Sequence, residues 1–295
     1  MTFEDHDNSS RNTESESAKT ESVRTEGTSA WDYSSHEEFL QYYAKESQSL
    51  ATIQRFTLIC ETILRVLSEQ QGQEEPLDVV DIGCGAGTQC FLWAERGHRV
   101  YGLDVNEPLV LLGKDRAAKR GHPVDFRVGS ATELPWPDRS MDVCLLLELL
   151  EHVEQWEVCL KQCVRILKPG GILFLTTSNR LCPVQHEFNL PLYSWYPSRA
   201  KRYFESLART DRPQLANHAV YPAVNWFTAY SLRAALGQYG LMTFDRFDLI
   251  DTSARGFLAR WIVAAIRAIP LLRWGAHVCT SGTTVLARKP GGTGN

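Results

Sequence analysis

The sequence lacks a long apolar run, a paired cysteine motif and an excess of positive charge. No stretch of 18 consecutive apolar residues occurs, so no segment is predicted to span a membrane. Eight cysteines are present without a C-x-x-C pair, which predicts free thiols in a reducing compartment rather than a zinc site or a disulfide framework. A net charge of −4, without a basic stripe, gives no reason to expect nucleic acid as a partner. Because no charged start precedes an apolar core, we expect no secretory signal and a cytoplasmic protein.

The composition suits a globular domain that follows a polar tail. Hydrophobic residues make up 43% of the 295 positions, which is ordinary for a chain with a substantial core. Residues 1–29 are rich in Ser, Thr, Glu and Asn, and we expect them to be disordered because they cannot bury enough apolar surface. From Trp31 to Ser68, apolar residues recur at spacings of three and four, which predicts helices.

A glycine-rich turn organises the rest of the chain. The stretch from Leu77 to Asp104 reads LDVVDIGCGAGTQCFLWAERGHRVYGLD, which predicts a strand, a tight turn, a helix and a second, parallel strand. Gly83, Gly85 and Gly87 let the chain reverse sharply and let a ligand approach bare backbone. An acidic residue at the tip of the second strand, Asp104, is placed to accept hydrogen bonds from two ribose hydroxyls.

The glycine spacing separates two kinds of cofactor. A dinucleotide fingerprint, G-x-G-x-x-G, would need a glycine where this chain has Thr88. The turn instead reads D-x-G-x-G-x-G from Asp81, and this pattern resembles the turn of the class I S-adenosylmethionine-dependent methyltransferases. The resemblance implies S-adenosyl-L-methionine as cofactor. That molecule has no phosphates, so the turn need not clasp a pyrophosphate.

Further motifs follow in the order that this family shows. They are L-P-W-P-D at 134–138, L-E-L-L-E-H-V at 147–153 and L-K-P-G-G-x-L at 167–173. With the glycine turn they extend from Leu77 to Thr177 and resemble the group that includes the ubiquinone-biosynthesis O-methyltransferases. The chain lacks the Trp-Trp-Asp pattern near the start of the ubiquinone enzymes, which argues against membership of that subfamily.

The resemblance implies an α/β fold with a Rossmann-like, doubly wound, seven-stranded sheet whose last strand is antiparallel, preceded by N-terminal helices and interrupted by a lid. After the second strand we expect strands at 124–128, 143–147, 172–177, 242–251 and 283–288, and helices at 107–121, 157–167, 231–239 and 257–269. The expected parts are a tail (1–29), cap helices (30–75), an S-adenosylmethionine-binding core (76–179), an acceptor-site lid (180–225), the rest of the core (226–289) and a tail (290–295).

The same resemblance assigns the cofactor contacts. Asp81 would contact the amino end of the methionine moiety, Asp104 would bind the ribose, and Val105 would pack on the adenine. At the tip of the third strand the family often has Asp where this chain has Ser130, whose hydroxyl can still hydrogen-bond to the adenine edge. The full set is Asp81, Gly83, Cys84, Gly85, Gly87, Asp104, Val105, Ser130, Ala131 and Leu147.

The candidate catalytic residues lie in the segment at 147–153, which follows a buried strand at the edge where open α/β sheets bind ligands. Glu148, Glu151 and His152 are spaced i, i+3 and i+4, so a helical turn would bring them to one face. We take His152 as the candidate general base, because imidazole titrates near neutral pH. A divalent metal held by these three side chains, and a purely structural role, are the two other interpretations. We assign no metal ligand.

The segment 180–225 is aromatic, rich in proline and too long for a simple connection. We interpret it as a lid over an apolar acceptor, with His186 and Tyr193 as further candidates; an insertion or an oligomer contact is the alternative. The predicted function is O-methylation of a small apolar or aromatic acceptor, such as a phenol, quinone precursor, lipid or natural product. N-methylation of a small molecule and a non-catalytic scaffold are the alternatives.

The predicted helix at 257–269 is apolar, with Arg260 and Arg267 seven residues apart on one face, and Pro270 is expected to break it. Trp274 follows shortly after. An apolar helix with a thin basic stripe and a nearby Trp is typical of a membrane-surface helix, but it is equally compatible with a cover over the sheet or the acceptor pocket. Peripheral membrane contact through 257–274 therefore stays open beside the cytoplasmic expectation.

Overall fold

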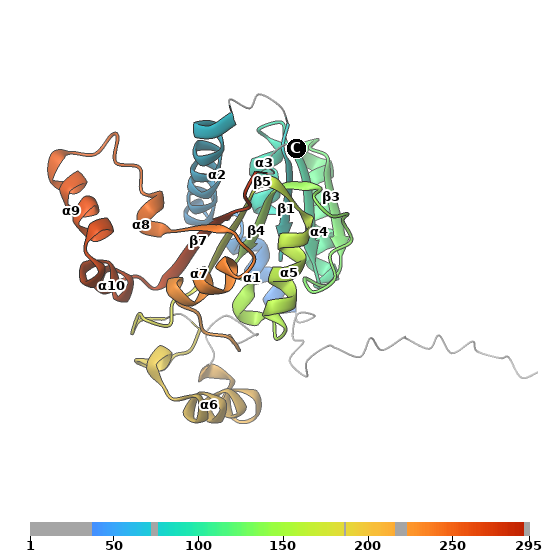
Figure 1. Ribbon diagram of the computed structural model, residues 1–295. Coiled ribbons are helices and arrows are strands. Elements are labelled where there is room, and N and C mark those ends of the chain that lie inside the picture. The colour runs from blue at the N-terminus through green and yellow to red at the C-terminus, as the bar shows by residue number, and fades with distance from the viewer. Residues whose placement is uncertain (1–36, 72–75, 186, 216–222, 292–295) are drawn as a thin grey trace, which may run out of the picture. The chain divides into compact units, whose positions relative to one another are not determined.

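The structure is a computed structural model, and it describes residues 37–71, 76–185, 187–215 and 223–291. The described residues belong to one compact unit, Trp31–Asn295, built around a sheet of seven described strands (Figure 1). The predicted disordered tail, 1–29, lies outside the described residues. The strands are β1 (Asp78–Ile82), β2 (Arg99–Asp104), β3 (Val124–Val128), β4 (Met141–Leu147), β5 (Leu167–Ser178), β6 (Met242–Asp245) and β7 (Gly282–Arg288).

The strand order is β3-β2-β1-β4-β5-β7-β6. β1 pairs in parallel with both β2 and β4, and β5 continues the parallel run beside β4. β7 is inserted antiparallel between β5 and β6. The predicted seven-stranded sheet with an antiparallel last strand is therefore confirmed. Because β6 is antiparallel to β7, the six strands other than β7 all run the same way, and their carboxyl ends meet at one edge of the sheet.

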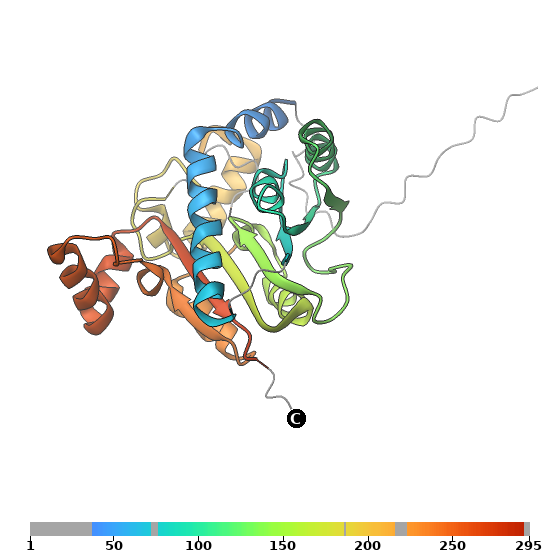
Figure 2. The ribbon, with the colours of Figure 1, turned by 90° about the horizontal axis from the view of Figure 1, so that it is seen from above.

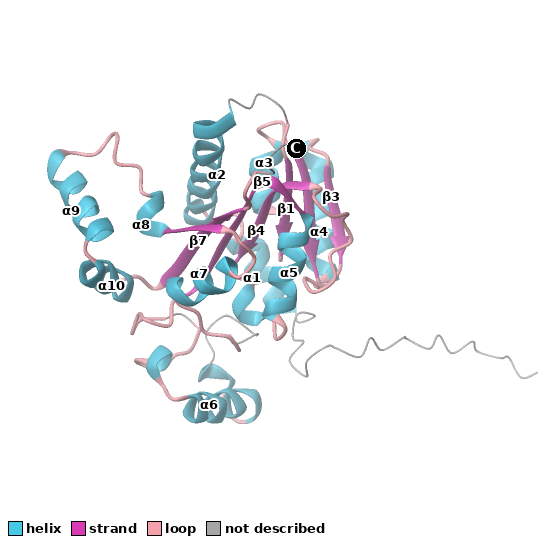
Figure 3. Ribbon diagram, viewed as in Figure 1, coloured by secondary structure: helices cyan, strands magenta, loops and turns pink. Residues whose placement is uncertain are grey.

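Helices cover both faces of the sheet (Figure 3). The sheet residues Val79 and Val80 show why, since adjacent strand residues point to opposite faces and both of these are fully buried. The α-helices are α1 (Glu37–Glu46), α2 (Leu50–Gln71), α3 (Thr88–Ala94), α4 (Glu107–Arg120), α5 (Trp156–Ile166), α6 (Ser198–Thr210), α7 (Ala229–Gly237), α8 (Arg246–Leu249), α9 (Phe257–Ala268) and α10 (Pro270–Val278). Short 3-10 turns are η1 (Leu150–His152), η2 (Tyr193–Trp195) and η3 (Pro213–Leu215).

The hydrophobic core consists of two layers, one on each face of the sheet. Buried residues of α2, α3 and α4 pack with one face of the sheet, and buried residues of α5 and α7 pack with the other. Figure 2, seen from above, shows the long helix α2 lying across the sheet. This sandwich holds the carboxyl edge of the parallel strands in a fixed arrangement.

The structure differs from the sequence prediction at several places in the second half of the chain. β5 begins at Leu167, five residues before the predicted start of that strand. The expected strand 242–251 ends at Asp245, because that side chain and Asp248 form a capping box that starts α8. The segment after β5 was expected to be irregular, but it contains the 13-residue helix α6. Pro270 does end α9, yet it also begins α10, because the fixed φ of proline suits the first turn of a helix.

Candidate active site

The carboxyl edge of the sheet gathers most of the residues that the sequence predicts for the site. The turn after β1 contains Gly83, Gly85 and Gly87, and β2 ends in Asp104 beside it. The segment from Glu148 follows β4 along the same edge.

Backbone geometry explains the three glycines of the turn. Gly83, Gly85 and Gly87 have φ values of +77°, +50° and +80°, a region that side chains disfavour. A Cβ added to Gly87 would lie 2.4 Å from Phe126 Cζ, and one added to Gly83 would lie 2.9 Å from Leu149 Cδ1. A Cβ on Gly85 would meet nothing closer than 3.9 Å. The turn is therefore packed tightly behind Gly83 and Gly87 and is open above Gly85.

Asp104 fastens this turn to the second strand. Its Oδ2 accepts a hydrogen bond from Gly85 N at 2.8 Å, and its Oδ1 accepts one from Asn106 N at 2.8 Å. Burial raises the pKa of this carboxyl, and the backbone hydrogen bonds act against that rise. A carboxylate oxygen can accept more than one hydrogen bond, so both oxygens keep capacity for the ribose hydroxyls of a cofactor.

The residues predicted for the adenine end lie beside Asp104 but differ in exposure. Val105 is 68% exposed, which leaves an apolar surface available at the strand tip. Ser130 is exposed, and its Oγ lies 2.7 Å from Thr132 Oγ1. Ala131 is buried behind it. The edge of the predicted adenine site is thus apolar at one end and hydroxylated at the other.

Asp81 is buried beneath the turn. Its side chain is 3% exposed, and the Cys90 thiol donates to its Oδ2 at 3.8 Å. Burial, together with the negative charge of Asp104, raises the pKa of Asp81 to about 7. Cys84, which belongs to the predicted cofactor set, is also buried. A positive charge placed over the turn would favour the ionised form of Asp81.

The N-terminal helices are attached to the glycine turn. Thr88 at the start of α3 donates to Ser47 O at 2.8 Å, in the connection between α1 and α2. Arg116 of α4 donates to Ser47 Oγ at 3.1 Å and to Ala44 O at 2.8 Å. The end of α1 and the α1–α2 connection therefore contact the first residue of α3, directly after the glycine turn, and the C-terminal half of α4.

The three predicted catalytic residues do not share one helical turn. Glu148 has φ +52°, so the chain reverses before η1, and only Glu151 and His152 belong to that turn. Glu148 Oε1 lies 3.7 Å from Arg55 Nη1 of α2. Glu151 is fully buried and accepts a hydrogen bond from Ser178 N at 3.3 Å. The expectation that all three side chains share one face is wrong, because Glu148 itself has left-handed backbone and lies outside the turn that holds Glu151 and His152.

A further carboxyl joins the site from the segment after β5. Ser178 Oγ donates to Glu187 Oε1 at 2.7 Å, while the backbone of the same serine donates to Glu151. Glu187 Oε2 is buried and has no hydrogen-bond partner among the described residues. Burial raises the pKa of Glu151 well above its usual value, and the charges of Glu148 and Glu187 add to that rise. Glu187 is not among the residues predicted from the sequence. It reaches the site only through its hydrogen bond with Ser178, nine residues earlier, and no motif marks that contact.

The two lid candidates named from the sequence have different outcomes. Tyr193 is fully buried in the segment's own core, where its ring stacks on Phe188 with centroids 4.2 Å apart. Burial raises the pKa of its hydroxyl, which donates toward Lys201 O and Glu205 Oε1. Tyr193 is therefore a packing residue. His186 lies outside the described residues.

The segment after β5 is tied to η1. Val224 N and Asn225 N donate to Glu151 O at 2.9 and 3.0 Å, and Asn225 Nδ2 donates to Val153 O at 2.7 Å. Lys201 of α6 places its ammonium 3.8 Å from the centroid of the Trp226 ring. Any movement of this segment would therefore be transmitted to the backbone that carries Glu151.

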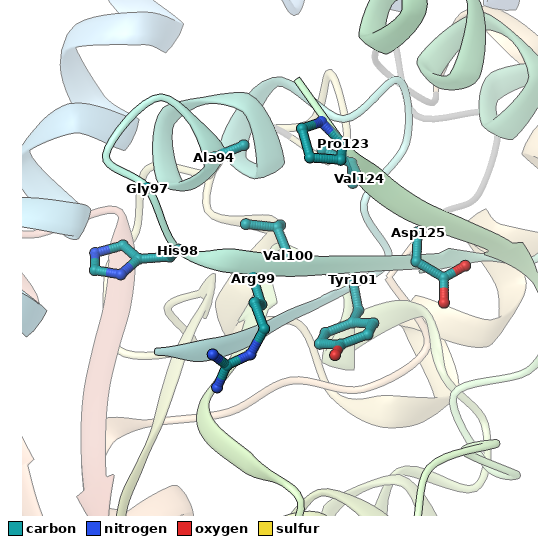
Figure 4. A pocket seen from close by; sticks show the side chains of 9 residues that line it. All are labelled: Ala94, Gly97, His98, Arg99, Val100, Tyr101, Pro123, Val124 and Asp125. Atoms are coloured by element: carbon teal, nitrogen blue, oxygen red, sulfur yellow. The ribbon is translucent and has the colours of Figure 1, made fainter. Parts of the chain in front are cut away.

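A shallow depression lies at the opposite end of the sheet (Figure 4). It is lined by the end of α3, the first residues of β2 and the start of β3, including His98, Tyr101 and Asp125. These positions belong to the amino ends of the strands, away from the glycine turn. The depression carries none of the predicted site residues.

Comparisons with known proteins agree with this architecture. A family model described as a methyltransferase domain matches residues 80–175. The ubiquinone biosynthesis O-methyltransferase of Maricaulis maris is 31% identical over 192 residues, which are 62% of this chain and 70% of that protein. The protein of the same name from Chelativorans sp. is 29% identical over 182 residues, 60% of this chain and 63% of that protein. In the Mesorhizobium japonicum protein of this name, 37% identity extends over 106 residues, 36% of this chain and 43% of that protein.

The chain thus spans less than two thirds of the length of several relatives that it matches. Among solved structures, the plantazolicin methyltransferase BpumL, determined in complex with SAH, superimposes with a TM-score of 0.57 at 13% identity. That likeness covers 88% of this chain and 92% of the other, and it shows the fold alone.

Proposed function

The chain belongs to the class I S-adenosylmethionine-dependent methyltransferases, and on that premise we propose that it methylates a hydroxyl group of a small apolar or aromatic acceptor. The choice of a hydroxyl is supported by the likeness to the ubiquinone biosynthesis O-methyltransferases, and one structural observation carries the cofactor site. The Asp104 carboxylate is bonded to the backbone of the open glycine turn at 2.8 Å, at the carboxyl edge of the parallel strands. Ligands of open α/β sheets bind at this edge.

The cofactor would lie along the glycine turn. The open position above Gly85 admits the cofactor close to bare backbone, where a side chain would obstruct it. The Asp104 carboxylate would accept hydrogen bonds from the ribose hydroxyls, and the exposed Val105 would pack on the adenine. The cofactor's ammonium would lie above the buried Asp81 and stabilise its ionised form. Leu147, at the end of β4, would present its backbone to the amino acid part.

The reaction is an in-line displacement at the methyl carbon. The acceptor oxygen forms a bond to that carbon, the carbon–sulfur bond breaks, and its electron pair remains on sulfur, which becomes the neutral thioether of S-adenosylhomocysteine. Most of the acceleration comes from holding the two reactants in line, because no new charge has to be created at the sulfur.

A hydroxyl acceptor must also lose its proton to a base. His152 is our candidate, because it lies on the carboxyl edge directly after Glu151, and neutral imidazole accepts a proton near pH 7. The segment 180–225, bonded to η1 through Asn225, would cover the acceptor.

The alternative of a divalent metal fits this arrangement poorly. Glu151 is turned inward onto Ser178 N, whereas Glu148 is directed toward the Arg55 guanidinium. Within the described ranges, no three His, Cys, Asp or Glu side chains are arranged to hold a metal ion. Removal of the acceptor's proton is therefore assigned to His152 and not to a metal-bound group.

The test of the proposal is turnover. The full chain is incubated with S-adenosylmethionine and a panel of phenols, catechols and apolar alcohols, and products are analysed by mass spectrometry for the added methyl group and its position. We expect methyl ethers with equal release of S-adenosylhomocysteine. His152→Gln should reduce kcat by about 10²–10⁴ without changing cofactor affinity. Methylation of amines alone would overturn the choice of a hydroxyl, and tight cofactor binding without any methylated product would overturn the proposed activity.

A further inference from the structure

The helices α9 and α10 present an apolar face that nothing in the described chain covers. Six of its large side chains are between 47% and 77% exposed. The inward side of α9 is different, since Val263 is buried at 7% exposure. Figures 1 and 2 both show this pair of helices projecting from the sheet on the side of β6 and β7. The apolar face consists of Phe257, Leu258, Trp261, Leu271, Leu272 and Trp274.

Buried polar contacts hold the pair in this orientation. Arg273 of α10 donates from Nε to Asp245 Oδ2 at 2.8 Å, and the buried His277 ring lies 3.2 Å from the same oxygen. Arg267 of α9 donates to Phe247 O, Asp248 O and Ile250 O, at the end of α8. Because these polar groups point inward and are paired, the apolar face is directed away from the sheet by the fold itself.

The segment that contains α9 and α10, residues 252–295, carries only positive charges. Residues 252–295 contain six of the 31 Lys and Arg residues and none of the 35 Asp and Glu residues. The rest of the chain is therefore acidic, although the whole carries only −4. Arg260 of α9 is exposed next to the apolar face, and so is Arg255, which precedes α9 and donates from Nε to Asp251 O at 2.9 Å. A partner for this surface must accept apolar side chains and carry negative charge.

The pair of helices also adjoins the carboxyl edge of the sheet. Asn179, just after β5, donates from Nδ2 to His277 O and to Thr280 O, both at 2.8 Å. Gly282, the first residue of β7, is paired with Ser178, the residue that bonds Glu151 and Glu187. A surface that binds the helices would therefore lie beside the candidate active site.

We propose that the apolar face of α9 and α10 binds the surface of an anionic phospholipid bilayer. Aromatic and aliphatic side chains enter the interface between headgroups and acyl chains, and the exposed arginines contact lipid phosphates. The helices lie on the bilayer, since within the described residues no helix is long and apolar enough to cross it. A second copy of the chain is disfavoured, because a two-fold contact through this face would oppose two segments without acidic residues.

The proposal is independent of the proposed methyltransferase activity and is tested without cofactor. Vesicles of phosphatidylcholine, with or without phosphatidylglycerol, are mixed with the full chain and floated through a density gradient. We expect the chain to float with the vesicles that contain phosphatidylglycerol and to be released by high salt. The double variant Leu258→Asp/Leu271→Asp should bind at least about tenfold more weakly, because two apolar anchors become repelling charges.

Leu58→Asp is the matched control, because Leu58 is 64% exposed on α2 and lies outside the apolar face. It should float like the unmodified chain. Thermal unfolding by circular dichroism verifies that each variant is folded. A second measurement needs no folding comparison: phosphatidylcholine brominated in its acyl chains, mixed with phosphatidylglycerol, should quench tryptophan fluorescence of the unmodified chain. The quenching should fall in Trp261→Phe/Trp274→Phe.

Three results would overturn the proposal. The unmodified chain could fail to float with anionic vesicles, or the double aspartate variant could float as well as the Leu58→Asp control. The third is a dimer in sedimentation velocity that dissociates in the double variant while no vesicle binding occurs, which would assign the face to a second copy. None of these results would contradict methyl transfer.

Discussion

Two buried aspartates, one in the interior strand β1 and one at the end of the edge strand β6, differ in how their charge is compensated. Asp81, beneath the glycine turn, accepts a hydrogen bond from only a thiol among the described residues, and burial raises its pKa to about 7. Burial would also raise the pKa of Asp245, but the bonds from His277 and Arg273 outweigh it and hold that pKa at about 2. In the proposed function, the Asp81 carboxyl would be ionised by a bound ligand, whereas the paired Asp245 carboxylate fixes α10 to the edge of the sheet.

Breaking the paired site should destabilise the folded protein. Arg273→Met keeps much of the side-chain volume but removes a charged hydrogen-bond partner of Asp245, whose side chain has no exposed surface. His277 and Arg233 remain nearby, so we expect the free energy of unfolding to fall by about 3 kcal/mol. Urea denaturation at pH 7 measures it. Arg260→Met, an exposed arginine of α9, is the control and should change stability by less than about 0.5 kcal/mol.

Neutralising the unpaired site should have the opposite sign. A raised pKa means that the folded state binds the proton of Asp81 more tightly than the unfolded chain does. Its contribution to stability is therefore complete below about pH 3.8 and is lost as the pH rises through about 7. Asp81→Asn removes this loss and should stabilise the cofactor-free protein at pH 8 by up to about 4 kcal/mol, with little effect near pH 4.

Asp78, three residues earlier in β1, provides the matched control. Its hydrogen bond with Arg99 is the main cause that lowers its pKa to about 2, against the effect of burial. Asp78→Asn should therefore destabilise the protein at pH 8 and lose this effect as the pH falls toward 2. Equal signs for the two variants in urea denaturation across pH 4–8 would refute the contrast between the paired and the unpaired carboxyl.

The glycine turn tests geometry separately from charge. Gly87→Ala combines an unfavourable left-handed residue with a Cβ at 2.4 Å from Phe126, and should lower the free energy of unfolding by roughly 2–4 kcal/mol. Gly97→Ala has the same φ region, +83°, with nothing within 4 Å, and should cost only about 1 kcal/mol. A comparable loss in both variants on thermal unfolding would mean that packing against Phe126 contributes nothing.

The smallest expected change concerns binding rather than folding. Asp104→Ala should weaken the binding of S-adenosylmethionine by about 1–3 kcal/mol, because the ribose hydroxyls lose their acceptor. Ser130→Ala, at the tip of the neighbouring strand, should weaken it by less. Isothermal titration measures both, and unchanged affinity in Asp104→Ala would refute the ribose assignment.

The parts of the site that the sequence predicts well are those whose geometry is local. The glycines at 83, 85 and 87 require left-handed backbone wherever this turn occurs, and Asp104 ends a strand that pairs directly with β1. The bounds of β2, α4, β3, β4 and α5 therefore agree with the sequence pattern within two residues. Beyond β5 the register depends on contacts between distant segments.

The features that sequence reasoning missed are non-local or depend on a single torsion angle. Glu187 enters the site only because Ser178 bonds it, and the reversal at Glu148 comes from one φ of +52°. The end of β6 was missed because the capping role of Asp245 was hidden in an alternating apolar pattern. No spacing rule could have shown that Asp81 is buried by the packing of α3.

Titration of the purified chain with S-adenosylmethionine and with S-adenosylhomocysteine, followed by calorimetry, tests the central claim most directly. We predict that both ligands bind with micromolar affinity, that the product binds no more weakly, and that affinity for the methyl donor rises as the pH increases through 7 and Asp81 ionises. Absence of heat with either ligand at every pH would contradict the assignment of the glycine turn and Asp104 to the cofactor.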